Sequence, residues 1–289
     1  MDLQNLQKQI DKIINEQNNR SKQDFEEYSA FEMNFILYAT FEPNSPITLQ
    51  KLAEADYVKC PMFNLVKYYL DLIKSKGEIK LTEKGFLPTK VVQEIYSQGF
   101  LEEYLFSSGS VKLYKESDSL TVNLTRLLAE LAQLTKKRAG KVSLTKTGEK
   151  LISDNQQLFE LILKTMTQKF SWAYYDYYEN NQIAQLGFGF SLILLAKYGA
   201  EKRLDHFYSQ KYFAAFPQLY EGMIPIYGTI EQYAGNCFSV RTFDRFMHYF
   251  GLVEIEEEGK FLDSKKFIRK TELFDKLIKV QPHTAHHSK

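Results

Sequence analysis

The sequence is poor in cysteine, in proline and in long apolar runs. Its two cysteines, Cys60 and Cys237, stand far apart among 289 residues, which excludes a CxxC metal knuckle. Such spacing is typical of reduced thiols in a cytoplasm, with one long-range disulfide as the alternative. The longest apolar stretch, residues 186–199, is too short for a membrane span and predicts a buried helix. The N-terminus does not resemble a secretory signal, so we expect a soluble, cytoplasmic protein with no membrane partner.

An excess of charge of one sign is also missing. The 37 Lys and Arg residues are balanced by 36 Asp and Glu residues, and the net charge is +1. A general attraction to nucleic acid is therefore excluded, and only a local basic patch could provide one.

Enzyme motifs are absent too, because the chain has no HExxH, no Gly-rich phosphate loop and no GxSxG. Asp205, His206, Cys237 and His248 could be drawn as a nucleophile set, but nothing in the sequence brings them together. We predict that the protein is not an enzyme, with no catalytic residue, no metal site and no cofactor.

Aromatic residues are abundant, with 19 Tyr and 22 Phe. The block Phe170–Asn180 holds the only tryptophan, Trp172. Interleaved rings of this kind either pack in a core or stack on the bases of a single strand. Few cations accompany the block, which favours burial, and we predict that Trp172 is buried.

The N-terminus predicts an amphipathic helix, since its apolar residues recur at helical spacing. They are Leu3, Leu6, Ile10, Ile13 and Ile14. Such a narrow stripe either docks on the body of the protein or pairs with a second copy to give a homodimer.

A Leu-Thr-x-x-Gly motif occurs twice, as LTEKG at 81–85 and as LTKTG at 144–148. The first copy follows helical patterns at 47–55 and 61–77 and precedes another at 89–96. The second follows a helical pattern at 120–134, with Asp118 or Ser119 as its N-cap, and the strand pattern KVSL, and precedes a helical pattern at 149–166. A degenerate third copy has a helical face at 240–250, a hairpin at 252–263 and a closing helix at 268–278.

This order of helix, strand, turn and helix resembles winged-helix regulators such as the multidrug-resistance repressor class. There the Thr can cap the last helix and the Gly permits the turn. The segments LTEKGFLP, LTKTGEKLI, FSWAYYDYY and SLILLAKYG further resemble an uncharacterised bacterial family of winged-helix-repeat proteins, over about residues 45–280. The resemblance implies a fold and implies no activity.

The predicted fold is mainly α, an α+β arrangement of tandem winged-helix-like units with small wings near 78–82, 141–145 and 252–263 and no large sheet. The predicted boundaries are N-terminal helices at 1–44, unit 1 at 45–105, unit 2 at 106–165, an aromatic-rich helical segment at 166–222, a degenerate unit 3 at 223–280 and a disordered tail at 281–289.

The predicted partner is DNA or another protein. In a DNA-binding winged helix the recognition helix reads bases and the wing touches phosphates. Arg126 is predicted to face outward and to read bases with Thr121, Asn123, Thr125 and Gln133. The phosphate contacts are predicted at Lys136, Lys137, Arg138, Lys141, Lys146 and Lys150.

A protein-interaction scaffold without DNA binding remains the alternative. The near-neutral charge favours it, and so do the acidic residues Glu254, Glu256, Glu257 and Glu258 in the third wing, which would repel phosphate. The basic second wing favours a transcriptional regulator.

Overall fold

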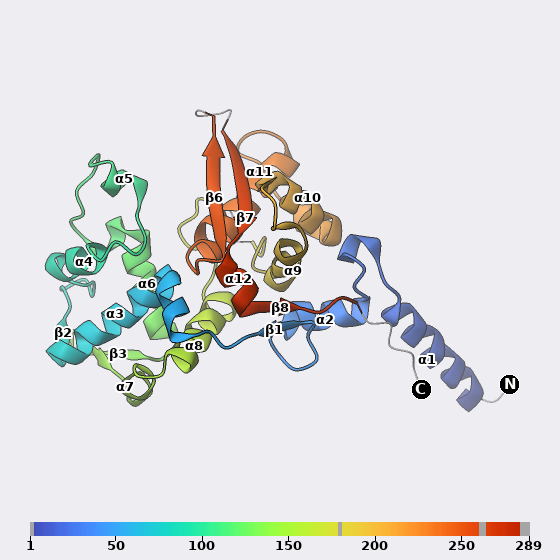
Figure 1. The fold of residues 1–289 in the computed structure, drawn as a ribbon, viewed down its shortest axis with the longest axis horizontal. Helices are drawn as coiled ribbons and strands as arrows, with labels where there is room; N and C mark the ends of the chain where they lie inside the picture. Colours follow the sequence, from blue (N-terminus) through green and yellow to red (C-terminus); the bar gives the residue numbers. More distant parts are fainter. Residues whose placement is uncertain (1–2, 179–180, 260–263, 284–289) are drawn as a thin grey trace. The chain divides into compact units, whose positions relative to one another are not determined.

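The structure is a computed structural model, and it describes residues 3–178, 181–259 and 264–283 (Figure 1). The described chain is mainly helical with small antiparallel sheets, which confirms the predicted fold class. It divides into two compact lobes, each built from segments that are distant in sequence. Lobe 1 comprises Met1–Gln50, Tyr178–Asp244 and Val253–Lys289, and lobe 2 comprises Lys51–Tyr177 and Arg245–Leu252.

Lobe 2 packs helices against a three-stranded sheet. In chain order its central elements are α3 (Pro61–Lys76), β2 (Ile79–Lys80), α4 (Thr89–Tyr96), α6 (Leu120–Leu131), β3 (Thr135–Arg138) and β4 (Lys141–Leu144). The sheet order is β2-β4-β3, with both pairs antiparallel. The short helix α5 (Tyr104–Ser107) lies in a long excursion between α4 and α6, and α7 (Lys146–Leu151) and α8 (Asn155–Gln168) follow the sheet. Ser119 caps α6 by accepting a hydrogen bond from the backbone N–H of Val122, as predicted.

Lobe 1 contains the same connectivity. Its central elements are α9 (Phe188–Tyr198), β5 (Arg203–Leu204), α10 (Asp205–Ala215), α11 (Ile230–Ser239), β6 (Val253–Glu258) and β7 (Lys265–Lys270), and the sheet order is β5-β7-β6. A π-helix at Val240–Met247 continues α11. In both lobes the strand before the hairpin, β2 or β5, pairs with the second strand of the hairpin, β4 or β7. The first strand of the hairpin, β3 or β6, then lies at the edge of the sheet.

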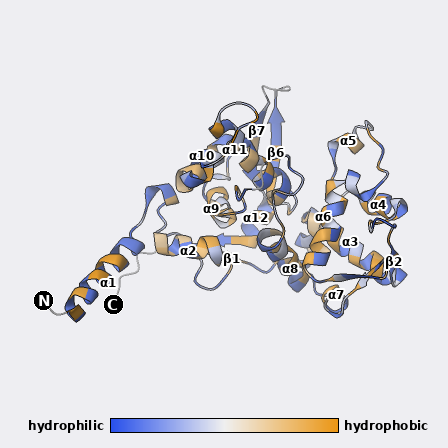
Figure 2. Ribbon diagram, turned by 180° about the vertical axis from the view of Figure 1, so that it is seen from behind, coloured by the Kyte–Doolittle hydropathy of each residue, from blue (hydrophilic) through white to orange (hydrophobic). Residues whose placement is uncertain are grey.

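The rest of lobe 1 comes from the two ends of the chain. It comprises α1 (Leu3–Asn19), α2 (Ala30–Tyr38), β1 (Ile47–Leu49), α12 (Glu272–Leu277) and β8 (Ile278–Val280). Strands β1 and β8 pair in antiparallel fashion. Helix α1 buries none of its residues, so its apolar stripe, orange in Figure 2, lies exposed and is not docked on the body. No helix in the described part of the chain combines the length and apolarity that crossing a membrane requires.

The two Leu-Thr-x-x-Gly stretches have different local structures. Thr145 caps α7 by accepting a hydrogen bond from the N–H of Gly148 at 3.0 Å. Thr82 instead closes a turn with Phe86, through a backbone hydrogen bond of 2.8 Å and a side-chain one of 3.1 Å. In lobe 1 the place of Thr145, after the last strand, is held by Thr271, which caps α12. The structural repeat therefore follows strand connectivity and not the motif.

Long-range strand pairing explains where the predicted elements differ from the structure. Predicted units 1 and 2 share one sheet, because β2 from the first pairs with β4 from the second. Residues 47–49 form β1 and not a helix, since β8 supplies a pairing partner from the far end of the chain. In the same way β7 pairs with β6 over its whole length, so residues 265–270 form a strand where a closing helix was predicted from residue 268.

The start of the predicted disordered tail is hydrogen bonded. The backbone N–H of Gln281 donates to the carbonyl of Pro46 at 2.8 Å, and the hydroxyl of Tyr28 donates to the carbonyl of Gln281 at 2.5 Å. The His283 ring lies 2.6 Å from the Glu32 carboxylate. Residues 284–289 lie outside the described part of the chain.

Candidate nucleic-acid interface

The predicted phosphate-binding cations lie on the sheet and on α7 of lobe 2. Lys136, Lys137 and Arg138 belong to β3, where a helix end was predicted, and Lys141 belongs to β4. Lys146 and Lys150 lie on α7. All six side chains are exposed, as a contact with phosphate requires.

Strand pairing places like charges opposite one another. Lys141 of β4 has a cation opposite it on each neighbouring strand. Arg138 of β3 is its partner on one side, and Lys80 of β2 is its partner on the other. Lys136 lies two residues from Arg138 and therefore faces the same side of the sheet. These four residues, Lys80, Lys136, Arg138 and Lys141, are called the basic sheet face below. Like charges directly opposite one another destabilise a sheet, so this face favours an anion.

Counter-charges on the basic sheet face are few. Lys141 forms an ion pair with Glu78, with both side chains about half exposed. No ion pair of Lys80, Lys136 or Arg138 occurs within the described residues. Exposed charges without a nearby partner are free to exchange their counterions for phosphates.

Lys137 takes a different position. Its partner on β4 is the buried Val142, and its ammonium group donates to the carbonyl of Gly85 at 3.5 Å. Gly85 has φ +79°, and a Cβ there would lie 2.2 Å from Nζ of Lys137. Lys137 thus links β3 to the turn that follows β2.

The hairpin of lobe 1 carries its charges in pairs. Arg269 binds Glu254 at 3.0 Å, Lys202 pairs with Glu256, and Lys266 binds Asp244 at 2.6 Å. Burial raises the pKa of the Asp244 carboxyl, against the opposing effect of Lys266. The two sheets share a connectivity, but strand pairing in lobe 1 places opposite charges opposite one another, as in Glu257 with Lys266, whereas strand pairing in lobe 2 places like charges there.

The prediction that Arg126 faces outward is wrong. Its side chain is only 9% exposed, and it donates to Glu116 and Glu130, each at 2.6 Å. Burial lowers the pKa of its guanidinium, but the two carboxylates more than offset this and raise it. Arg126 is therefore a buried structural cation and is closed to base edges.

The other predicted base readers on α6 are covered as well. Thr121, Asn123 and Thr125 are all buried, whereas Gln133, just after the helix, is exposed. The Glu103 carboxylate from the excursion accepts the backbone N–H groups of Leu120 and Thr121, each at 3.1 Å, at the N-terminus of α6. Charged residues in an irregular segment follow no periodicity, so the contact of Glu103 with α6 could not be predicted from the sequence.

The aromatic block is partly buried and partly exposed. Trp172 is 2% exposed, as predicted, and its Nε1–H donates to the carbonyl of Met166 at 2.8 Å. Its ring lies 4.8 Å from that of Phe246, centroid to centroid. Tyr175 and Tyr177, by contrast, are 61% and 92% exposed. The burial predicted for the block therefore does not hold for these two rings.

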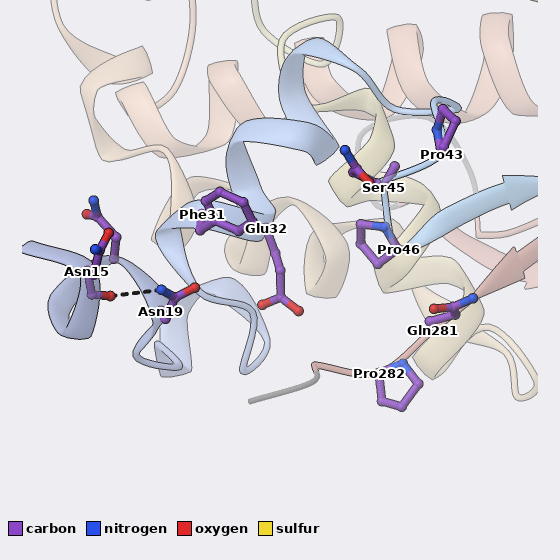
Figure 3. Close-up of a pocket in the computed structure, with 11 residues that line it drawn as sticks. Asn15, Asn19, Phe31, Glu32, Pro43, Ser45, Pro46, Gln281 and Pro282 are labelled. Carbon is purple, nitrogen blue, oxygen red and sulfur yellow. Dashed lines mark hydrogen bonds between the residues drawn. The ribbon is translucent and has the colours of Figure 1, made fainter. Parts of the chain in front are cut away.

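A cavity of about 590 Å³ in lobe 1 lies between the end of α1, the start of α2 and the strand ends (Figure 3). Asn15, Phe31, Pro46 and Gln281 are among its lining residues, and the Glu32 side chain reaches into it. Glu32 already accepts hydrogen bonds from the backbone N–H and the hydroxyl of Ser29. No Lys or Arg among the described residues lines this cavity, so these residues give no support for a phosphate site there.

Metal-binding and nucleophilic chemistry find little support among the described residues. They contain no group of three or more His, Cys, Asp or Glu side chains placed to hold a metal ion. Both cysteines are buried thiols. Burial, with the Asp56 carboxylate nearby, raises the pKa of the Cys60 thiol to about 12, which disfavours the reactive thiolate.

Comparison with known proteins finds a relationship for lobe 2 only. Residues 58–157 match the family model of the Y4jL N-terminal domain, a description that names no activity. No curated protein matches the chain, and no solved structure does. The matched segment contains α6, the basic sheet face and both predicted phosphate-binding lysines of α7, and in this part the chain is similar to the Y4jL N-terminal domain.

Proposed function

We propose that the chain is a non-enzymatic nucleic-acid-binding protein of winged-helix type, which contacts phosphates through the basic sheet face of lobe 2. The observation that carries the proposal is the row Arg138, Lys141 and Lys80 on three neighbouring strands, with Glu78 as its one ion-pair partner among the described residues. Repulsion within such a row lowers the stability of the free protein, and binding of a polyanion would relieve this repulsion.

The winged-helix description rests on connectivity. Each lobe runs helix, strand, helix, helix and hairpin, with the first strand paired to the last strand of the hairpin. In a DNA-binding protein of this fold the hairpin would reach the phosphate backbone. This analogy concerns the fold, and the argument for function comes from the charges on the sheet.

The mode of binding that fits the surface is contact with the backbone and not base reading. Helix α6 corresponds in order to a recognition helix, but its polar positions are covered and Arg126 is held by two carboxylates. Phosphate contacts position a protein on nucleic acid and carry no sequence information. We therefore propose salt-dependent binding with weak sequence preference, with Lys146 and Lys150 as further contacts.

A protein partner is the second candidate, and it is favoured by the excursion between α4 and α6. Tyr104, Leu105 and Tyr114 in that segment are 81%, 58% and 62% exposed. Exposed apolar side chains along one segment are a feature of interaction surfaces. A homodimer through the exposed stripe of α1 is a separate proposal about assembly.

The test compares two double variants with equal loss of charge. Lys136→Ala with Arg138→Ala removes half of the basic sheet face, and Lys265→Ala with Arg269→Ala removes two cations from the hairpin of lobe 1. Binding of a labelled 20-base-pair duplex is measured by anisotropy as a function of salt. We expect the first variant to lower the slope of log affinity against log salt by roughly one unit per lost contact, and the second to leave it unchanged.

The wild-type protein decides between the two candidates. If it shows no salt-dependent binding to DNA or RNA at low ionic strength, the nucleic-acid proposal is rejected. A protein partner would then be sought with Tyr104→Ser and Leu105→Ser as the variants expected to lose it.

A further inference from the structure

A second surface of lobe 2 is suited to a planar ligand. A cavity of about 320 Å³ lies beside the N-terminal end of α6, which is within the range of small-ligand sites. Aromatic side chains line it from two segments of the chain, Phe86 from the turn after β2 and Tyr174, Tyr175 and Tyr177 from the aromatic block. Asn123, Ser117 and Arg245 supply polar groups.

The backbone that carries the two exposed rings is held in a conformation of high energy. Tyr175 and Tyr177 have φ of +52° and +64°, in the left-handed region that non-glycine residues rarely adopt. Arg245 fixes this loop by donating to the carbonyls of Tyr174, at 2.7 Å, and of Tyr175. Strain of this kind at exposed rings is typical of a binding site that is already organised before its ligand arrives.

The charges around the cavity favour a neutral ligand over a phosphate. The N-terminus of α6, which would otherwise attract an anion, is occupied by the Glu103 carboxylate. Asp118 accepts the backbone N–H groups of Tyr114 and Lys115 at 3.3 and 3.1 Å. The Arg245 guanidinium, which lines the cavity, already donates to two backbone carbonyls, so these two carboxylates disfavour a phosphate.

Polar side chains at the cavity can still form hydrogen bonds with the edge of a planar ligand. The Asn123 amide donates to Glu116 at 2.8 Å and accepts from the Tyr174 hydroxyl at 3.1 Å, which leaves one N–H and one lone pair of the side chain uncommitted by these bonds. The Ser117 side chain is exposed at the cavity. A ligand with flat apolar faces and a polar edge could stack on the rings and form hydrogen bonds with Asn123 and Ser117. A nucleobase has this chemistry.

The cavity adjoins a turn that carries one exposed lysine and accepts a hydrogen bond from another. Phe86, in its lining, directly follows Gly85, whose carbonyl accepts from Lys137 of β3. Lys84, on the same turn, is exposed. A strand whose phosphates lie against these lysines would therefore bring its bases to the rings.

We propose that this cavity accommodates one unpaired nucleobase, stacked on Tyr175 or Tyr177, of a strand whose phosphates lie against Lys84 and Lys137. The proposal rests on the proposed function and adds to it a preference for single-stranded or bulged nucleic acid over a closed duplex. Base stacking on aromatic side chains tolerates different bases, so the preference concerns strandedness and not sequence.

The variants Tyr175→Ala and Tyr177→Ala test the proposal against Tyr104→Ala, which removes another exposed ring, one outside the cavity. Binding of a labelled 12-nucleotide DNA strand and of its duplex is measured by anisotropy. We expect each cavity variant to weaken binding of the single strand on the order of tenfold, with an unchanged salt slope and little change for the duplex. Tyr104→Ala should bind as the wild type does, and melting temperatures of all variants confirm folding.

A second measurement separates the two proposals. Saturation-transfer NMR with a free nucleoside, which has no phosphate, should show contact with the base protons in the wild type and lose it in Tyr177→Ala. If oligonucleotides bind with normal salt dependence but the tyrosine variants match the wild type in both assays, the cavity proposal is overturned and the proposed function stands. If the nucleoside contact depends on Tyr177 while no oligonucleotide binds, the proposed function and the strand preference are both rejected, and only the binding of a free base at the cavity stands.

Discussion

The buried cluster around Glu116 predicts an unusually large loss of stability from one substitution. The Glu116 side chain is fully buried and accepts three hydrogen bonds, from the backbone N–H of Leu87 at 2.7 Å, Nδ2 of Asn123 at 2.8 Å and Nε of Arg126 at 2.6 Å. Glu116→Ala leaves all three donors without this acceptor. An unpaired buried donor costs about 1–3 kcal/mol, and breaking a buried ion pair costs about 3–5 kcal/mol.

We therefore expect Glu116→Ala to lower the free energy of unfolding of lobe 2 by about 4 kcal/mol, against a typical total of about 5–15 kcal/mol. Glu130→Ala is the matched control. Glu130 is 29% exposed and accepts one hydrogen bond, from the same guanidinium. Its loss should cost less than about 1 kcal/mol, because solvent screens a partly exposed pair.

Urea unfolding followed by tryptophan fluorescence measures this difference directly, since the only tryptophan, Trp172, lies in lobe 2. Circular dichroism on the same samples reports both lobes. Equal losses for Glu116→Ala and Glu130→Ala would refute the reasoning, and so would an Arg126→Ala variant that keeps full stability and changes only base preference.

Three further outcomes follow from the structure. Trp172, 2% exposed, should be quenched slowly by acrylamide, and addition of oligonucleotide should leave the rate unchanged; fast quenching would contradict its burial. Gly148→Ala should destabilise lobe 2 by about 1–3 kcal/mol in the same urea assay, because a Cβ there would lie 2.2 Å from the carbonyl oxygen of Leu134. An unchanged stability would show that the backbone shifts to make room for the methyl group. If α1 pairs with a second copy, Ile10→Asp should convert a dimer to a monomer in light scattering, and a wild-type monomer would reject that assembly.

Helical periodicity was the most reliable guide to the fold. The leucine spacing and Ser119 located α6 and its N-cap, and the apolar run at 186–199 located α9. Strands β2 and β5 are two residues long and too short to show a period of two, so the sheet that unites 61–144 could not be predicted. The Leu-Thr-x-x-Gly motif misled because a helix cap and a closed turn use the same residue types.

The candidate site was predicted in part. The exposed cations of β3 and β4 could be read from the sequence, because a basic run on a short hairpin has few places to be buried. Lys80 belongs to the basic sheet face only because β2 pairs with β4, about 60 residues later in the chain. A local sequence pattern does not predict pairing over that distance. Tyr175 and Tyr177 are exposed on a loop whose left-handed backbone angles tyrosine rarely adopts. Such angles cannot be predicted from the residue types, and the aromatic run on its own predicts burial.

The discontinuous make-up of lobe 2 has a consequence during translation. Residues 51–177 leave the ribosome well before Arg245–Leu252, the segment that completes the lobe. The Trp172 ring therefore lacks its Phe246 neighbour, and the Tyr174–Tyr175 loop lacks the Arg245 guanidinium, until about 70 further residues have been synthesised. The nascent lobe meanwhile exposes part of its aromatic core, and a gene fragment that stops at residue 177 would leave it in that state permanently.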